Sequence, residues 1–84
     1  MKLACHINHF IRSQKVYVAD DKGAVVKTID CELVDLPNTL EGLCSQYAVN
    51  KVYISGGINF TEKLAEDLKT RHTFAKNNIE IIVD

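Results

Sequence analysis

The sequence lacks the features that would place it in a membrane or give it a strong charge of one sign. No apolar run approaches the roughly 20 residues that a membrane-spanning helix needs, and the first residues are mixed, with His6, Asn8 and His9 among them. Lys and Arg number 10 against 11 Asp and Glu, a formal net charge of −1. This balance does not favour capture of nucleic acid or of an anionic membrane, and we expect neither as a partner. The expectation is a soluble, cytoplasmic protein.

Cysteine is scarce, and the spacing of the cysteines indicates neither a disulfide framework nor a zinc-binding motif. Cys5, Cys31 and Cys44 are widely separated and form no CxxC pair, which argues against disulfides and against a zinc finger. Cys5, His6 and His9 are metal-ligating residue types, but in a strand Cys5 and His6 point to opposite faces. We therefore predict no metal site and no cofactor, with the cysteines as small core residues.

The length of the chain, 84 residues, predicts a single domain over residues 1–84. A domain of this size buries only about 60–65% of the surface that its unfolded chain exposes. The resulting stability margin is thin, and self-association or a partner often enlarges it. We expect a homo-oligomer, such as a homodimer, or a domain that docks on another protein.

Hydrophobic periodicity predicts the secondary structure. Alternation of apolar and polar residues indicates strands over 2–8, 15–19 and 24–29, with the third continuing toward residue 33, and Gly23 supplies a hairpin turn. Helical spacing follows Pro37 and again follows Gly57, and strands are predicted at 51–54 and 79–83. The predicted core between helices and sheet consists of Leu40, Leu43, Tyr47, Val52, Ile54, Leu64 and Leu68.

Both helix starts carry residues at capping-box spacing. Asn38 with Glu41, and Asn59 with Glu62, are predicted to cap the two helices. Gly42, inside the first helix, indicates close packing of that helix on the sheet. Two i,i+4 ion pairs, Lys63 with Asp67 and Asp67 with Arg71, are assigned to the solvated face of the second helix.

The order of these elements, βββαβαβ, defines an α/β fold with a five-stranded mixed sheet. Because β-α-β crossovers are almost always right-handed, the predicted spatial order of the strands is 3-2-1-4-5, with strands one, four and five parallel.

This order resembles the ribonuclease-H-like fold, which also forms each half of the actin-like ATPases. The stretch 52–57, Val-Tyr-Ile-Ser-Gly-Gly, followed by Phe-Thr-Glu-Lys-Leu at 60–64, is similar to the adenosine-contacting strand and helix of those ATPases. The resemblance implies carboxylates on strand one for a nuclease, and a glycine-bearing phosphate loop after it for an ATPase. Strand one here carries His6 and no acid, and residues 9–13 contain no glycine. We therefore predict no catalytic residues and no enzymatic activity of either kind.

A ligand site is predicted where parallel strands one and four end, because ligands gather at the carboxyl ends of strands in open α/β sheets. The candidate ligand-binding residues are Asn8, His9, Ser55, Gly56, Gly57 and Asn59. The alternative is that the two glycines only let the chain turn from strand to helix.

Three functions follow from this sequence. The first is a non-catalytic protein-interaction or self-association domain, whose edge strands could pair with a partner. The alternative is a small-ligand or nucleotide/phosphate-binding module that uses the Ser-Gly-Gly turn. The third is a hydrolase or transferase that uses His6 or His9.

Overall fold

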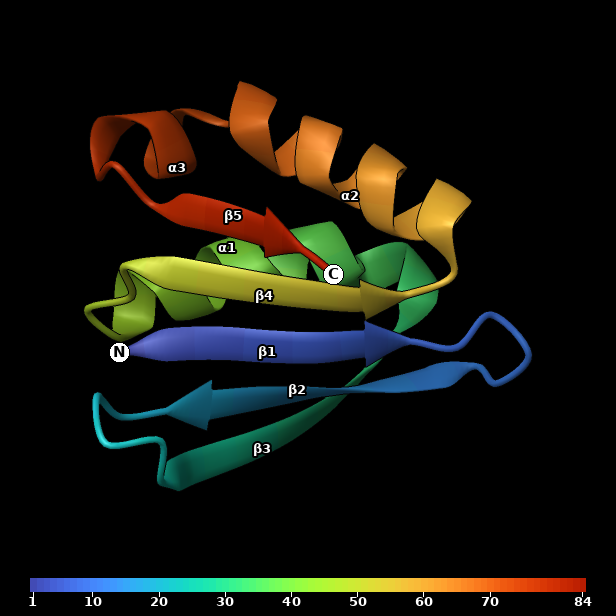
Figure 1. Cartoon of the computed structure of the whole chain (residues 1–84), viewed down its shortest axis with the longest axis horizontal. Helices are drawn as coiled ribbons and strands as arrows, with labels where there is room; N and C mark the ends of the chain where they lie inside the picture. Colours follow the sequence, from blue (N-terminus) through green and yellow to red (C-terminus); the bar gives the residue numbers. More distant parts are fainter.

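The computed structural model describes the backbone of residues 1–84 and every side chain except that of residue 58. Five strands form one mixed sheet in the order β3-β2-β1-β4-β5, as the order of elements predicts (Figure 1). The elements are β1 Lys2–Ile7, β2 Ser13–Ala19, β3 Val25–Glu32, the 3-10 helix η1 Leu33–Asp35, α1 Leu36–Gln46, β4 Lys51–Gly56, α2 Ile58–Thr70, α3 His72–Lys76 and β5 Glu80–Val83.

Strand β1 lies at the centre of the sheet. It pairs antiparallel with β2 and parallel with β4, while β2 with β3 is antiparallel and β4 with β5 is parallel. The two hairpin strands thus lie on one side of β1 and the two crossover strands on the other. Strands β1, β4 and β5 run in one direction, which confirms the predicted parallel set.

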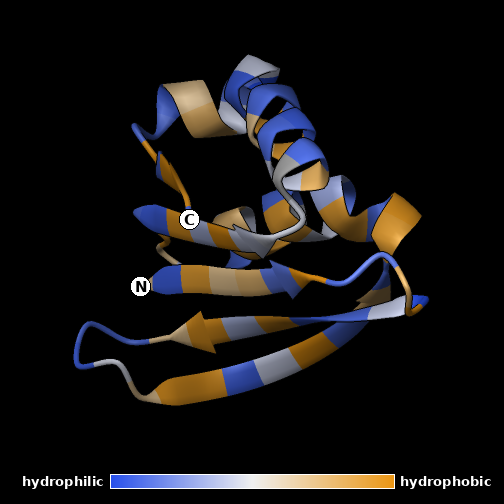
Figure 2. Cartoon of the chain, turned by 45° about the vertical axis from the view of Figure 1, so that its right-hand side comes forward, coloured by the Kyte–Doolittle hydropathy of each residue, from blue (hydrophilic) through white to orange (hydrophobic). Residues whose placement is uncertain are grey.

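The helices cover one face of the sheet, and the core lies between the helices and that face. Along β1, Leu3, Cys5 and Ile7 are buried while His6 is exposed, so alternate residues define an inner and an outer face. Each predicted core residue is buried except Tyr47, which is half-buried and packs against the same cluster. The buried core also includes Leu3, Ile7, Val16, Val18, Leu36, Val49, Ala65, Phe74 and Ile79. Figure 2 shows the corresponding alternation of hydropathy along the strands.

Both helices begin earlier than the capping-box spacing predicts. Helix α1 starts at Leu36 with Asp35 as its N-cap residue, and α2 starts directly after Gly57. Neither N-cap residue makes a side-chain hydrogen bond to its helix, so the predicted caps Asn38 and Asn59 are wrong. Pro37 fits inside the first turn because the amides of that turn have no intrahelical partner to lose.

The prediction for Gly42 is also wrong. Gly42 is exposed, and a methyl group built on it would meet nothing within 4 Å. The helix therefore packs on the sheet through Leu36, Leu40 and Leu43, on its opposite side.

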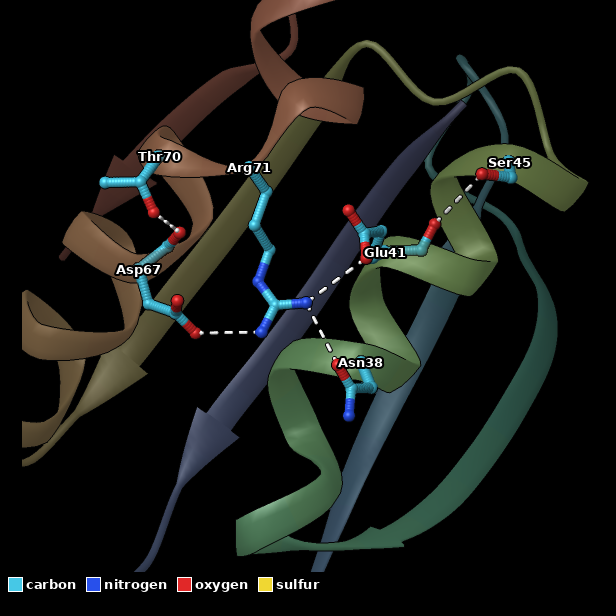
Figure 3. A network of polar contacts seen from close by, with 6 residues as sticks. All are labelled: Asn38, Glu41, Ser45, Asp67, Thr70 and Arg71. Atoms are coloured by element: carbon cyan, nitrogen blue, oxygen red, sulfur yellow. Dashed lines mark hydrogen bonds and ion pairs between the residues drawn. The ribbon is translucent and has the colours of Figure 1, made fainter.

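Arg71 links the two long helices rather than lying on a solvated face. It follows α2, and its guanidinium contacts Asp67 at 3.3 Å, Glu41 at 3.1 Å and Asn38 at 2.9 Å (Figure 3). The carboxylates and the hydrogen bonds they accept raise the pKa of Arg71, with Asp67 the largest cause. Asn38 thus accepts a hydrogen bond from the residue that follows α2 instead of capping its own helix.

None of the helices that the structure describes is long and apolar enough to cross a membrane.

Candidate functional site

The six predicted ligand-binding residues occupy the carboxyl end of β1 and β4, but their side chains have separate surroundings. Ser55 Oγ lies 3.0 Å from His6 Nδ1 on the outer face of the sheet. His9 stacks on Phe60 of α2 with ring centroids 5.1 Å apart, and a methyl group built on Gly57 would lie 3.6 Å from His9 Nδ1. Asn59 is exposed on the first turn of α2. The fold therefore brings His9 and Gly57 together with Phe60, while Ser55 and Asn59 lie elsewhere.

Asn8 and Gly56 have structural partners. The Asn8 side-chain oxygen accepts a hydrogen bond of 3.0 Å from the Phe10 amide, which shapes the loop between β1 and β2. Gly56 has φ +121°, and a side chain there would overlap the Ile7 carbonyl oxygen of the neighbouring strand. Close pairing of β4 with β1 is thus sufficient to explain the first glycine.

Sequence reasoning missed Gln14, the residue that orders the β1–β2 loop. Gln14 is buried at 2% exposure. Its Oε1 accepts the Asn8 amide at 2.9 Å, and its Nε2 donates to the carbonyls of Asn8 at 2.9 Å and Ile11 at 2.8 Å. The signal was available, because Gln14, Val16 and Val18 alternate and the two valines mark the inner face.

This ordered loop holds apolar side chains out into solvent. Phe10 is 88% exposed and Ile11 56%, and nearby Val34 is 78% and Phe60 42% exposed. His9 lies between the two phenylalanines, 4.2 Å from Phe10 by ring centroid. We call Phe10, Ile11, Val34 and Phe60 the apolar tip.

A groove of about 220 Å³ continues from the apolar tip along the helices. Phe60 and Leu64 of α2 form one wall, Leu36 and Pro37 of α1 the other. Apolar surface thus extends from the loop to the junction of the two helices, and such patches mark interaction sites.

The outer face of the sheet carries a second hollow, of about 430 Å³. Ala4 forms part of its lining, with Tyr17 and Tyr53 beside it and His6 and Ser55 farther along the strands. We call this outer surface of β2, β1 and β4 the open face. Helix α1 lies behind β4 in Figure 1, and α2 and α3 lie above β5.

The remaining reactive side chains indicate core roles. Burial raises the pKa of Cys5 to about 12 and that of Cys44 to about 11, so both thiols stay protonated at neutral pH. All three cysteines are free, and among the described residues no group of three or more His, Cys, Asp or Glu could hold a metal ion.

Comparison with known proteins gives no identification, because no family model, curated protein or solved structure matches the chain. Its function has to be inferred from the fold and from these two surfaces.

Proposed function

We propose that the chain is a non-catalytic, ribonuclease-H-like domain that self-associates through its apolar tip. The strand order 3-2-1-4-5 supports the assignment to this fold. The positions where nucleases of this fold hold carboxylates are His6 on β1 and Ser55 on β4, neither of which binds Mg²⁺ readily. Loss of the acids is consistent with a domain that keeps the scaffold and works by binding.

The observation that carries the proposal is the exposure of Phe10 on a loop that hydrogen bonds hold in place. Large apolar side chains on a mobile loop would have no fixed surface to offer, but Gln14 and Asn8 fix this one. A preordered loop loses little conformational freedom on binding. Two copies can bury the same patch against each other, because an isologous interface needs only a self-complementary surface.

Sedimentation velocity over a range of protein concentrations tests this proposal. We expect a concentration-dependent dimer that the double variant Phe10→Ser/Ile11→Ser abolishes while its circular dichroism stays unchanged. The matched control is Val25→Ser/Val26→Ser, which removes two exposed apolar side chains from the outer strand β3.

The control also distinguishes the tip from edge pairing. If the β3 variant loses the dimer and the tip variant keeps it, association occurs through the edge of the sheet and the tip assignment is wrong. A parent chain that sediments as a monomer at every concentration would contradict self-association altogether.

The alternative, nucleotide or phosphate binding at the Ser55-Gly56-Gly57 turn, has weaker support. Ser55 faces the open side of the sheet with His6, whereas His9 lies against Gly57. A thermal-shift measurement with nucleotides and inorganic phosphate tests it: a ligand-dependent rise in melting temperature would favour this alternative.

A further inference from the structure

The open face combines two aromatic side chains in one row. Ala4 of β1 pairs with Tyr17 of β2 on one side and with Tyr53 of β4 on the other. Two strand spacings of about 4.8 Å separate the tyrosine backbones by roughly 10 Å. The small Ala4 side chain leaves the space between the rings clear, and Tyr17 is 37% exposed there. The row therefore offers two separate π-surfaces, one for each of two flat rings.

Cationic side chains flank this row on both sides. Lys2 pairs in register with Lys51, two residues before Ala4 and Tyr53. Lys15 lies two residues from Tyr17 in the opposite direction along the sheet. Two residues of strand span about 6.6 Å, so each tyrosine has an ammonium group within reach of a ligand stacked on it.

The carboxylates near this face come from outside the three central strands. The outward residues of the three central strands include no Asp or Glu: they are Lys2, Ala4, His6, Ser13, Lys15, Tyr17, Ala19, Lys51, Tyr53 and Ser55. Asp30 and Glu80 belong to the outer strands β3 and β5, and Asp84, which follows β5, lines the hollow on the side of Tyr53. The outward charges of the three central strands are thus all positive, and the carboxylates are contributed by β3, β5 and the residue after β5.

Two of the lysines have acidic neighbours that a ligand can replace. Lys15 Nζ lies 3.0 Å from Asp30 and Lys51 Nζ 4.0 Å from Glu80, and both pairs are solvent-exposed. Exposed pairs of this kind contribute little, so a phosphate group can take the place of the carboxylate. Lys2 has no acidic partner among the described residues.

We propose that the open face binds single-stranded nucleic acid, with one base stacked on each of Tyr17 and Tyr53 and the phosphates held by Lys2, Lys15 and Lys51. Stacking tolerates every base because each has a π-face, so we expect little sequence preference. Three phosphate contacts predict a slope of about −2 when the logarithm of the binding constant is plotted against that of salt concentration.

The net charge of the chain led to the opposite expectation. A formal charge of −1 excludes a strong overall field but says nothing about where the lysines lie. The residues of the open face come from three segments, residues 2–6, 13–19 and 51–55, and only the pairing of the strands brings them together.

Fluorescence anisotropy of labelled oligothymidylate and oligouridylate, about eight nucleotides long, tests the proposal at about 20 mM and about 200 mM salt. We expect saturable binding that weakens with salt along the stated slope. The variant Tyr53→Leu, which keeps an apolar side chain but removes the aromatic ring, should weaken binding about tenfold or more. Lys2→Ala should weaken it and lower the salt slope by about 0.7.

Two controls separate this face from the rest of the chain. Lys69→Ala removes an equal charge from the exposed surface of α2 and should leave binding unchanged. Phe10→Ser/Ile11→Ser alters the apolar tip and should also leave it unchanged, so the result does not depend on the proposed self-association. Circular dichroism verifies that each variant is folded.

Absence of binding by the folded parent chain at low salt would overturn the proposal. Equal weakening of oligonucleotide binding by Lys2→Ala and Lys69→Ala would also overturn it, because it would indicate a general electrostatic attraction and no specific site. If Tyr53→Leu instead changes the sedimentation of the chain and leaves anisotropy unaffected, a second copy covers the open face and the nucleic-acid assignment is wrong.

Discussion

Two adjacent glycines at the end of β4 have different structural requirements. Gly56 has φ +121°, and a Cβ there would lie 2.9 Å from the Ile7 nitrogen and still closer to the Ile7 carbonyl oxygen. Gly57 has φ −63° and ψ 123°, which any residue adopts, and its Cβ would make only ordinary contacts. The strain therefore belongs to one glycine of the pair.

We predict that Gly56→Ala lowers the free energy of unfolding by at least about 2 kcal/mol. The change requires both an unfavourable backbone conformation and a displacement of β1. Gly57→Ala serves as the matched variant and should stay within about 1 kcal/mol of the parent chain. Urea denaturation measures both, and similar losses in the two variants would contradict the assignment.

Cysteine ionisation predicts a loss of stability at alkaline pH. Burial raises the pKa of Cys5 to about 12 from the ordinary value of 9.0. Above pH 9 the unfolded chain releases this proton while the folded chain keeps it, so the free energy of unfolding falls with rising pH until the folded thiol also ionises. The contribution approaches about 1.4 kcal/mol for each pH unit between those two values.

The variant Cys5→Ala isolates this contribution. Its urea denaturation, compared with that of the parent between about pH 9 and about pH 11, should show a shallower decline of stability with pH. Tyrosine and lysine ionisation affects both proteins alike and cancels in the difference. Identical pH dependence in the two would contradict the assignment of the effect to Cys5.

At the scale of elements, helix α1 contains a glycine, Gly42, that no contact or backbone conformation requires. Gly42 lies inside the helix, is exposed, and has open space around its Cα. Alanine is about 1 kcal/mol more favourable than glycine in a helix interior because it loses less backbone entropy on folding. We predict that Gly42→Ala raises the free energy of unfolding by about 0.5–1 kcal/mol. A destabilised variant in urea denaturation would restore the close-packing interpretation.

The β1–β2 loop depends on one buried side chain. Gln14 makes three hydrogen bonds to the backbone of residues 8–11. We predict that Gln14→Ala lowers the free energy of unfolding by about 1–3 kcal/mol, because it removes the side-chain partner of the Asn8 amide and of the Ile11 carbonyl. The Asn8 carbonyl keeps its hydrogen bond from the Ile11 amide. The Asn8 amide should also exchange hydrogen faster. Gln46→Ala, on the exposed end of α1, is the control and should change neither quantity.

Hydrophobic periodicity predicts the type of each element but not where each helix begins. Alternation at residues 2–7 and helical spacing from Leu40 onward identify strand and helix because burial of one face fixes the period. The helix starts could not be identified in this way, since Asn38 has capping chemistry but bonds Arg71 across the helix pair. Which partner a polar side chain takes is decided by tertiary contacts that local spacing does not contain.

For the whole molecule, the strand order was predictable and the surfaces were only partly so. Two crossovers and a three-stranded antiparallel meander leave few right-handed arrangements, and the observed order is the expected one. His9 follows the end of β1 and Ser55 lies near the end of β4, in the region where the sequence predicted a ligand site. The sequence could not predict that His9 stacks on Phe60 or that Ser55 contacts His6, because side-chain directions depend on the completed sheet.

The whole fold should unfold cooperatively. One cluster of buried residues draws on β1, β2, β4 and all three α-helices, with Ile29 of β3 and Ile81 of β5 packed against it. No element has a core of its own, so the chain should unfold in one transition. Helical circular dichroism and tyrosine fluorescence should therefore give the same midpoint in urea.

The first half of β3 should separate from β2 locally, without unfolding of the whole chain. Residues 25–28 are exposed on an outer strand, whereas the paired segment of β2 contains the fully buried Val18. With little apolar burial to lose, this segment can separate from β2 without unfolding the core. Native-state hydrogen exchange should show the β3 amides that bond to β2 exchanging at residues 25–28 well before those of β1. Equal protection along β3 and β1 would contradict this, and would mean that something covers the outer edge of β3.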